Sequence, residues 1–258
     1  MEALPYNKNI FREKNKLYTL NLIPGKRVYG EKLIKRDNKE FREWNPRRSK
    51  LAAAILKGLR IIPLREDTKV LYLGASTGTT VSHISDIVRE GLIFAIEFAP
   101  KVARELFFLS KERENIFPIL ADANFPLSYY PFMTKVDLIF QDIAQPNQVD
   151  ILVKNIYYYL KPNKFFMIAI KSRSIDVTKK PDLIYFLIKR HIEEYGLKIE
   201  QEIKLEPYEK DHIFFIGKFN GKIKKPGSIK WIDIVSKYEK EFKREKRKTK
   251  KDNFQKRR

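Results

Sequence analysis

Short apolar runs alternate with helical segments from Ser49 onward, and this alternation limits the folds that are open to the chain. The apolar runs are nearly continuous, which is typical of parallel strands covered on both faces of a sheet. The expected strands are residues 69–73, 92–98, 116–121, 136–141 and 165–170, and the expected helices between them are residues 79–88, 100–111, 148–160 and 181–195. The pattern predicts an α/β fold with a doubly wound, Rossmann-like sheet.

Two further apolar runs, residues 199–205 and 213–219, follow without a full helix between them. We expect them to form a hairpin, so that the sheet gains an antiparallel last strand. Near the N-terminus, residues 16–23 and 28–34 flank the turn dipeptide Pro24-Gly25 and predict another β-hairpin. We therefore expect a small N-terminal β-rich domain (1–50), a Rossmann-like domain (51–220) and a basic C-terminal extension (221–258).

The chain carries a large surplus of positive charge, because 53 lysines and arginines stand against 32 acids and give a formal net charge of +21. Such a surplus favours a polyanionic partner such as RNA, although general solubility is an alternative reason for it. Residues 243–258 alone hold ten lysines or arginines and two acids. Charge this dense predicts a mobile arm, or a helical extension for its first turns. The arm is expected to bind RNA; the alternatives are an inert tail, or a docking helix that uses the apolar residues before it, Trp231, Ile232, Ile234 and Val235.

Several kinds of site are excluded by composition. The chain has no cysteine, so disulfides, thiolate metal sites and thiol nucleophiles are excluded, and with three histidines no metal site is expected. No apolar run is long enough to span a membrane, and the first residues are charged where a signal peptide needs an apolar core. We expect an intracellular protein without a membrane partner.

Residues 70–80 form a predicted strand that runs through a turn of small residues into a predicted helix. Gly74 allows a ligand to approach the backbone closely, and the helix start at Thr79 and Thr80 offers N–H groups without helical partners. By itself the turn is equally consistent with a tight strand-to-helix connection.

An acid stands at the end of each of the next three strands: Glu97, Asp122 and Asp142. Because the carboxyl ends of parallel strands meet at one edge of a sheet, these carboxylates should gather there. Glu97 is placed to bind two ribose hydroxyls, and Asp122 to bind an adenine amino group. One acid after a strand is usually a cap or turn residue, but three in series after a glycine turn favour a nucleoside cofactor. The glycine fingerprint and the lysine of pyrophosphate-binding loops are absent, so S-adenosyl-L-methionine fits best.

These residues lie in longer stretches that resemble fibrillarin, in particular the archaeal fibrillarin-like rRNA/tRNA 2′-O-methyltransferases. The most specific stretches are Asp-Ile-Ala-Gln-Pro-Asn-Gln at 142–148 and Pro-Tyr-Glu-Lys-Asp-His at 207–212. The others are Trp44-Asn45-Pro46 with residues 48–51, and residues 73–80, 95–100, 122–123 and 170–176. They follow the family's order over about residues 16–220. The Arg/Gly-rich extension of eukaryotic fibrillarins is missing, and the basic tail after Gly221 departs from the archaeal pattern.

The resemblance implies a Rossmann-like methyltransferase that works in a box C/D ribonucleoprotein, in the cytoplasm if the source is archaeal. Its partners would be a box C/D guide RNA, the target rRNA or tRNA, a Nop-domain scaffold protein and, through the particle, a kink-turn-binding protein. Together with Gly74 of the turn, the cofactor contacts carried over by position are Thr79, Thr80, Glu97, Phe98, Asp122, Ala123, Asp142 and Gln145. The implied catalytic set is Lys50, Asp142, Lys171 and His212.

The implied reaction needs a ribose 2′-hydroxyl held in line with the methyl group, and that hydroxyl must lose its proton. Lys171 is a candidate base or orienting group, Asp142 would orient the lysine, and His212 would position the hydroxyl. Each residue also has a plain structural alternative. Lys171 could be a surface lysine, Asp142 a helix cap and His212 a strand-edge histidine. Lys50 could be one more solvated cation. The arginines nearest to these positions are the expected RNA contacts: Arg47, Arg48 and Arg173.

Other assignments stay open at this point. Phe98 is either a core residue or a stacking partner for adenine, whereas His83 and His191 fall inside predicted helices and are expected to be structural. Two alternative functions compete with RNA methylation: methylation of a protein glutamine, and a non-catalytic role as an RNA-binding assembly subunit. The complete lysine–aspartate–lysine–histidine set argues against the second.

Overall fold

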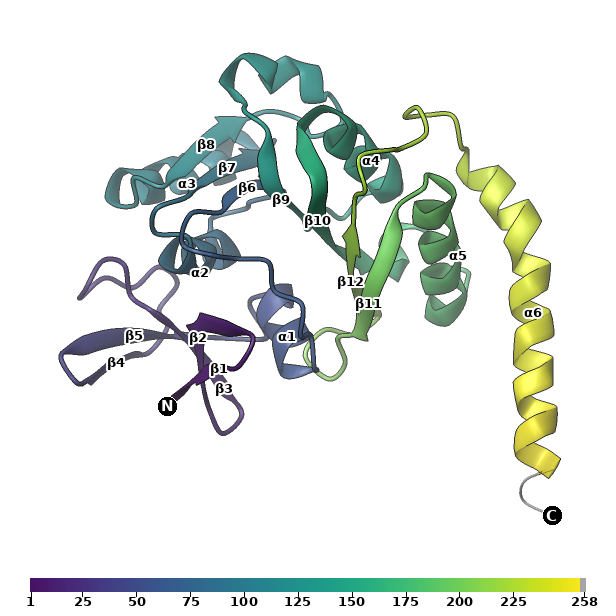
Figure 1. The fold of residues 1–258 in the computed structure, drawn as a ribbon, viewed down its shortest axis with the longest axis horizontal. Coiled ribbons are helices and arrows are strands. Elements are labelled where there is room, and N and C mark those ends of the chain that lie inside the picture. Colours follow the sequence, from purple (N-terminus) through teal and green to yellow (C-terminus); the bar gives the residue numbers. More distant parts are fainter. Residues whose placement is uncertain (256–258) are drawn as a thin grey trace.

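The computed structural model describes the backbone of residues 1–255 and the side chains of residues 1–245, and it contains two β-sheets (Figure 1). The N-terminal sheet has five antiparallel strands in the order β1-β2-β3-β5-β4. Its strands are β1 (Glu2–Leu4), β2 (Asn7–Glu13), β3 (Lys16–Leu20), β4 (Leu33–Arg36) and β5 (Lys39–Trp44).

The predicted hairpin around Pro24-Gly25 is wrong, because β3 pairs with β2 and β5 and not with β4. Residues 28–31 are held as a turn by Glu31, whose carboxylate accepts hydrogen bonds from the backbone N–H groups of Val28 and Tyr29. The true partner strand, β5, was hidden by its charged residues. Arg42 is fully buried there, and its guanidinium is neutralised by Glu31 at 2.6 Å and by Asp86 at 2.8 Å.

The second sheet confirms the Rossmann-like prediction, with seven strands in the order β11-β12-β10-β9-β6-β7-β8. Strand β12 is antiparallel to both of its neighbours, as the predicted terminal hairpin requires. The strands are β6 (Lys69–Leu73), β7 (Leu92–Glu97), β8 (Ile116–Leu120), β9 (Val136–Gln141), β10 (Leu160–Lys171), β11 (Lys198–Lys204) and β12 (His212–Lys218). The helices are α1 (Lys50–Leu56), α2 (Thr79–Ile87), α3 (Pro100–Glu112), α4 (Gln148–Tyr159), α5 (Pro181–Glu194) and α6 (Trp231–Gln255), with 3-10 turns at Pro126–Phe132 and Ser172–Ser174.

Helices α1 and α2 lie between the two sheets (Figure 1), and one apolar core is continuous from β3 and β5 through these helices to the middle of the large sheet. Trp44 stacks on His83 with 4.9 Å between ring centroids. His83 is completely buried, with hydrogen bonds to Thr19 and Tyr29 at 2.7 Å each, so its structural role is confirmed. The N-terminal sheet is thus fixed on the helices that frame the edge of the large sheet.

Within the C-terminal extension, Trp231–Gln255 fold as helix α6, which packs on α5. Ile234 is buried against Leu183 and Leu187, and the rings of Phe186 and Phe242 lie 5.2 Å apart. Of the two expected conformations of the basic tail, the helical extension is the one observed as far as Gln255. Among residues 1–255 no helix combines the length and the apolar character that crossing a bilayer requires.

Candidate functional site

The turn after β6 brings the backbone of three strands together at the carboxyl edge of the large sheet. Gly74 has φ +82°, and a Cβ atom at this position would overlap the carbonyl oxygen of Asp142. Gly78, with φ +91°, is the N-cap of α2 and has no side chain to cap the helix. Consequently the first N–H groups of α2, at Thr79 and Thr80, face this edge without a side-chain cap from Gly78.

Glu97 ends β7 and joins the turn to the neighbouring loop. One carboxylate oxygen accepts a 2.8 Å hydrogen bond from the N–H of Ser76, and the other accepts a 2.9 Å bond from the N–H of Ala99. The side chain is 7% exposed. Each oxygen can accept a further bond, so Glu97 can hold the turn and still receive ribose hydroxyls. The structure therefore gives Glu97 the turn role that an acid after a strand usually has, and leaves its remaining acceptor sites available to a ligand.

Asp122 and Gln145, predicted to contact the cofactor, are linked through Asn124. The Asn124 side-chain amide donates to Asp122 Oδ1 at 3.0 Å and to Gln145 Oε1 at 2.9 Å. Ala123 is buried beside them, whereas Phe98 is 65% exposed at the end of β7. The exposed ring rules out the core alternative for Phe98 and leaves its face free to stack on a flat ligand.

Lys50 lies on the first turn of α1 and reaches across to Asp142 at the end of β9. Its Nζ donates a 2.9 Å hydrogen bond to Asp142 Oδ2, and the two side chains are 24% and 23% exposed. The start of α1 is fixed by Ser49, whose hydroxyl accepts hydrogen bonds from the N–H of Ala52 and from the hydroxyl of Thr80 at 3.0 Å. Lys50 is therefore an anchored cation, and its reading as one more solvated lysine is wrong.

Lys171 and His212 form a cross-strand pair at the same edge, since they face each other in the antiparallel register of β10 and β12. Strand β10 also pairs with β9, which ends next to Asp142. His212 is buried, and its Nδ1–H donates a 2.6 Å hydrogen bond to the carbonyl of Lys210. That bond leaves Nε2 of a neutral ring as an acceptor. Lys171 is exposed, so it is accessible from solvent.

The arginines expected to bind RNA lie on exposed loops around this edge. Arg173 donates to Asp211 Oδ2 at 3.1 Å and to the carbonyl of Val177 at 2.8 Å. The guanidinium of Arg48 lies 5.7 Å from the ring centroid of Tyr29, and Arg47 is exposed beside it. Arg48 and Arg173 are therefore positioned by local contacts, while their charges stay near solvent.

Sequence reasoning missed two residues that organise the edge. Ser49 precedes an apolar helical run, which is the usual sequence signal for an N-cap. Asn124 follows Asp122 in a short turn, where asparagine commonly bonds local backbone. Neither signal reveals the distant partner, which is Thr80 of α2 for Ser49 and Gln145 of the loop after β9 for Asn124.

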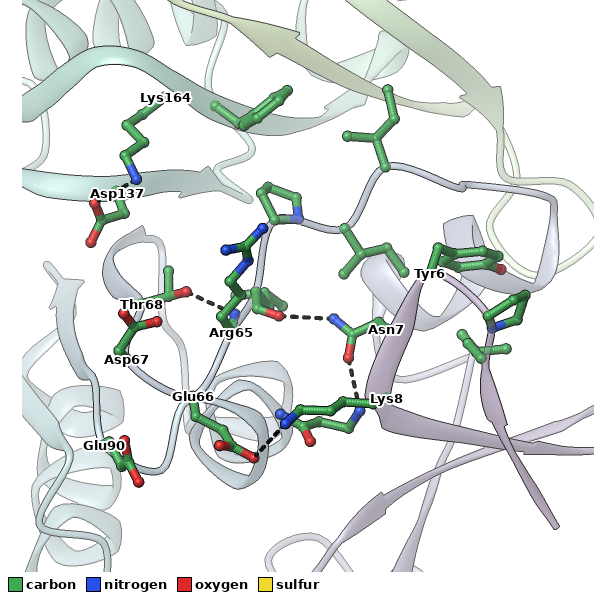
Figure 2. A pocket seen from close by; sticks show the side chains of 18 of the residues that line it. Tyr6, Asn7, Lys8, Arg65, Glu66, Asp67, Thr68, Glu90, Asp137 and Lys164 are labelled. Atoms are coloured by element: carbon green, nitrogen blue, oxygen red, sulfur yellow. Dashed lines mark hydrogen bonds and ion pairs between the residues drawn. The ribbon is translucent and has the colours of Figure 1, made fainter.

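A cavity of about 950 Å³ lies elsewhere, at the amino ends of the strands. It is formed by the turn between β1 and β2, the segment 61–68 and the starts of β9 and β10. In Figure 2, Asn7 bonds the backbone of Leu64 and Lys164 pairs with Asp137, so several of its polar groups are already satisfied. We assign the chemistry to the opposite edge. No group of three or more metal-binding side chains occurs among residues whose side chains the structure describes.

Comparison with known proteins agrees with this geometry. The sequence model of the Fibrillarin family matches residues 5–221. The fibrillarin-like rRNA/tRNA 2′-O-methyltransferase of Methanocaldococcus jannaschii is 52% identical over 207 residues, which are 80% of this chain and 90% of that protein.

Two solved structures are similar over the same region. Aeropyrum pernix fibrillarin in complex with natively bound S-adenosyl-L-methionine is 40% identical, with a TM-score of 0.77 over 84% of this chain and 96% of that chain. The fibrillarin/Nop5p complex contains a chain that is 43% identical, with a TM-score of 0.78 over 85% of this chain and all of that chain. The family match runs from the N-terminal sheet past β12 and leaves α6 outside, and it confirms the resemblance seen in the motifs: the chain belongs to the fibrillarin family.

Proposed function

We propose that this protein transfers a methyl group from S-adenosyl-L-methionine to ribose 2′-hydroxyls of rRNA, and of tRNA, as the enzyme of a box C/D ribonucleoprotein. The observation that carries the proposal is the meeting of the Lys50–Asp142 ion pair and the Lys171–His212 strand pair at the edge that also holds the Gly74 turn. Similar proteins support the cofactor and substrate, because one binds S-adenosyl-L-methionine and another is named an rRNA/tRNA 2′-O-methyltransferase.

The residues at this edge suit the cofactor. The oxygens of Glu97 accept ribose hydroxyls beside the backbone bonds that they already make. The exposed ring of Phe98 stacks on adenine, and the Asp122–Asn124–Gln145 chain binds the adenine edge. The cofactor supplies a methyl group on a positive sulfur, which is already a good electrophile. The protein's task is then to orient the hydroxyl and to remove its proton.

In the proposed mechanism the 2′-oxygen attacks the methyl carbon as the carbon–sulfur bond breaks, and the hydroxyl proton passes to Lys171, since the amine of Lys50 already donates to Asp142. Lys171 is exposed at the end of β10, and it accepts that proton as a neutral amine. Lys50 binds one carboxylate oxygen of Asp142. The second oxygen of Asp142 can orient Lys171 or the substrate. His212, with its Nδ1–H fixed to the Lys210 carbonyl, offers Nε2 to the ribose.

The partners are proposed from the same comparisons. A similar fibrillarin was solved with Nop5p, which supports a Nop-domain scaffold for this chain. Guide RNA and a kink-turn-binding protein follow as further members of the particle. Residues 1–255 fold into the two sheets and their helices, with no separate compact base-reading module among them. We therefore infer that base pairing with the guide selects the nucleotide, while exposed cations bind phosphates without reading sequence.

The test is assembly of the full chain with guide RNA, scaffold and kink-turn-binding protein, followed by mapping of 2′-O-methyl groups on a target RNA. We expect one methylated nucleotide set by the guide, none when Lys171→Ala replaces the wild type, and little site-selective methylation by the lone chain. Robust selective methylation of naked RNA by the lone chain contradicts the guide. Methyl transfer only to protein glutamine supports the protein methyltransferase alternative. No methyl transfer by an intact particle supports the non-catalytic assembly role.

A further inference from the structure

Helix α6 lies outside the region that matches the family, and its contacts with α5 determine where it runs. Its first half is anchored on α5. Lys237 Nζ lies 2.5 Å from Glu194 Oε1, Glu241 Oε1 accepts a 2.7 Å bond from Arg190 Nη2, and Phe242 contacts Phe186. These contacts fix the direction of α6 relative to α5.

That direction leads toward the catalytic edge. Contacts that move along α6 from Lys237 to Phe242 move back along α5 from Glu194 to Phe186, so the two helices are antiparallel. Helix α5 begins at Pro181, a few residues after Lys171, so its N-terminal end lies at the carboxyl edge of the sheet. The chain from Lys243 to Gln255 adds about 20 Å of helix, whereas α5 continues for only about 7 Å beyond Phe186. Figure 1 shows α6 extending well past α5.

Charge is divided along α6 between the anchored and the projecting half. Residues 231–242 contain two lysines and three acids, whereas residues 243–255 contain seven lysines or arginines and two acids. The acid Glu241 in the anchored half is used in the contact with α5. Lys243, the first residue of the projecting half, is 63% exposed. A net charge of +5 within one short segment opposes helix packing and suits a polyanion.

The same edge carries further exposed cations. Lys171 is the last residue of β10, Arg173 lies in the 3-10 turn that follows it, and Lys210 lies in the loop before β12. All three are exposed. A basic helix that runs toward such an edge adds to its positive field. RNA provides evenly spaced phosphates for such contacts, without any need for base recognition.

We propose that residues 243–255 form a cationic arm that holds the phosphate backbone of the RNA beside the catalytic edge. The arm contributes affinity and alignment, and it takes no part in the chemistry. The inference rests on the proposed function, because it assumes that RNA is the molecule brought to this edge. RNA is the partner expected on this helix, and binding of a protein scaffold there is the alternative that the experiment distinguishes.

The test compares two variants of equal charge change in the assembled particle. The arm variant carries glutamine at five positions of the projecting half: Lys246→Gln, Arg247→Gln, Lys248→Gln, Lys250→Gln and Lys251→Gln. The control variant carries glutamine at five exposed lysines of the N-terminal sheet: Lys8→Gln, Lys14→Gln, Lys32→Gln, Lys35→Gln and Lys39→Gln. Circular dichroism and thermal unfolding check that both fold, and deletion after Phe242 serves as a second arm variant.

The readout is the affinity for guide–target RNA at several salt concentrations, together with KM and kcat. Each lost phosphate contact should flatten the slope of log affinity against log salt by about 0.7–0.9, so the arm variant should lose roughly 1.5 or more. Its KM for RNA should rise about tenfold or more, with turnover at saturating RNA within about twofold. The control should lose less than one contact.

The possible results distinguish failure of the proposed arm from failure of the proposed methyltransferase function. An unchanged slope in an active particle overturns the arm and indicates an inert tail. Lost assembly with the scaffold, with affinity for bare RNA intact, overturns it in favour of protein docking. If the wild-type particle transfers no methyl but the arm variant still loses RNA affinity, the proposed function fails and the arm stands.

Discussion

Lys50 and Asp142, 92 positions apart in the chain, form a 2.9 Å ion pair that joins the start of α1 to the end of β9. The lysine is fixed because Ser49 caps α1 and is itself bonded by Thr80 of α2. The aspartate is fixed because its backbone lies directly against Gly74. A helix that follows the N-terminal sheet thus supplies a cation to the edge of the large sheet.

Replacing this cation should impair catalysis more than folding. In Lys50→Ala we expect kcat for RNA methylation to fall by about 10- to 100-fold, because Asp142 loses the partner that orients it. The pair is partly exposed, so the free energy of unfolding should change by at most about 1 kcal/mol. Turnover by the assembled particle and urea unfolding of the lone chain measure the two effects.

The matched control is Lys16→Ala, which removes a 3.0 Å ion pair with Glu43 in the N-terminal sheet. It should cost similarly little stability and leave kcat unchanged. Equal kcat values for Lys50→Ala and Lys16→Ala would remove Lys50 from the catalytic set.

Glu97 should determine affinity for the cofactor. Glu97→Ala removes a carboxylate that we expect to accept two ribose hydroxyls, and the affinity for S-adenosyl-L-methionine should fall by about 2–3 kcal/mol. Because both oxygens also hold backbone N–H groups, the ligand-free variant should unfold at a lower temperature as well. Glu97→Gln keeps one acceptor oxygen, so its cofactor affinity and its unfolding temperature should lie between those of the wild type and Glu97→Ala. Calorimetry on folded variants gives the affinities, and an affinity that does not change in Glu97→Ala contradicts the assignment.

The parts of the fold that were predicted from sequence are those whose residues are apolar and can be buried without a charged partner elsewhere in the chain. Most strands of the large sheet are nearly continuous apolar runs, and their predicted bounds agree with the observed ones within one residue, except that β10 begins at Leu160, five residues before the predicted start. Strand β5 was missed because Arg42 is buried only through Glu31 and Asp86, which lie outside the strand. A charge whose partners are distant in sequence gives a local pattern that resembles a solvated loop.

The candidate site shows the same division. The acids Glu97, Asp122 and Asp142 were found because a parallel sheet places the ends of its strands at one edge. Asn124 and Ser49 were missed because their bonds to Gln145 and Thr80 depend on tertiary packing. The path of α6 was also beyond the sequence, since only its contacts with α5 set its direction.

Gly74 should not tolerate a side chain. Its φ is +82°, and a Cβ atom would overlap the carbonyl oxygen of Asp142, so Gly74→Ala must separate β6 from β9 at the catalytic edge. We expect a loss of at least about 2 kcal/mol in stability and a cofactor affinity at least about tenfold weaker.

Gly58→Ala is the matched control, because Gly58 also has positive φ, at +104°, but has open space around the added methyl group. It should cost only the backbone strain, about 1 kcal/mol, and leave cofactor binding intact. Thermal unfolding and calorimetry on both variants check this. Similar losses of cofactor affinity in the two variants would show that strain, rather than the contact with Asp142, is responsible.

The buried histidine between the two sheets should make the fold sensitive to mild acid. Burial, and then the positive charges of Arg42 and Arg113, lower the pKa of His83 well below its usual value of 6.5. Thr19 donates its hydroxyl proton to Asp86 Oδ2 at 2.6 Å, so its oxygen accepts from Nδ1–H of His83. The ring is therefore held neutral in the folded protein.

Between pH 6.5 and pH 5 the unfolded chain binds a proton at His83 and the folded chain does not, so stability should fall as pH falls. Above pH 6.5 the residue is neutral in both states and contributes no pH dependence. The slope from this one group approaches about 1.4 kcal/mol per pH unit below the unfolded pKa. Urea unfolding of the wild type and of His83→Gln at several pH values measures it, and the variant should show a slope smaller by that amount. Because the variant also loses the stack on Trp44 and starts from lower stability, NMR of the His83 imidazole in the wild type provides an independent check. A ring that protonates near pH 6.5 while the protein stays folded would contradict both the assigned hydrogen bonds and the predicted acid sensitivity.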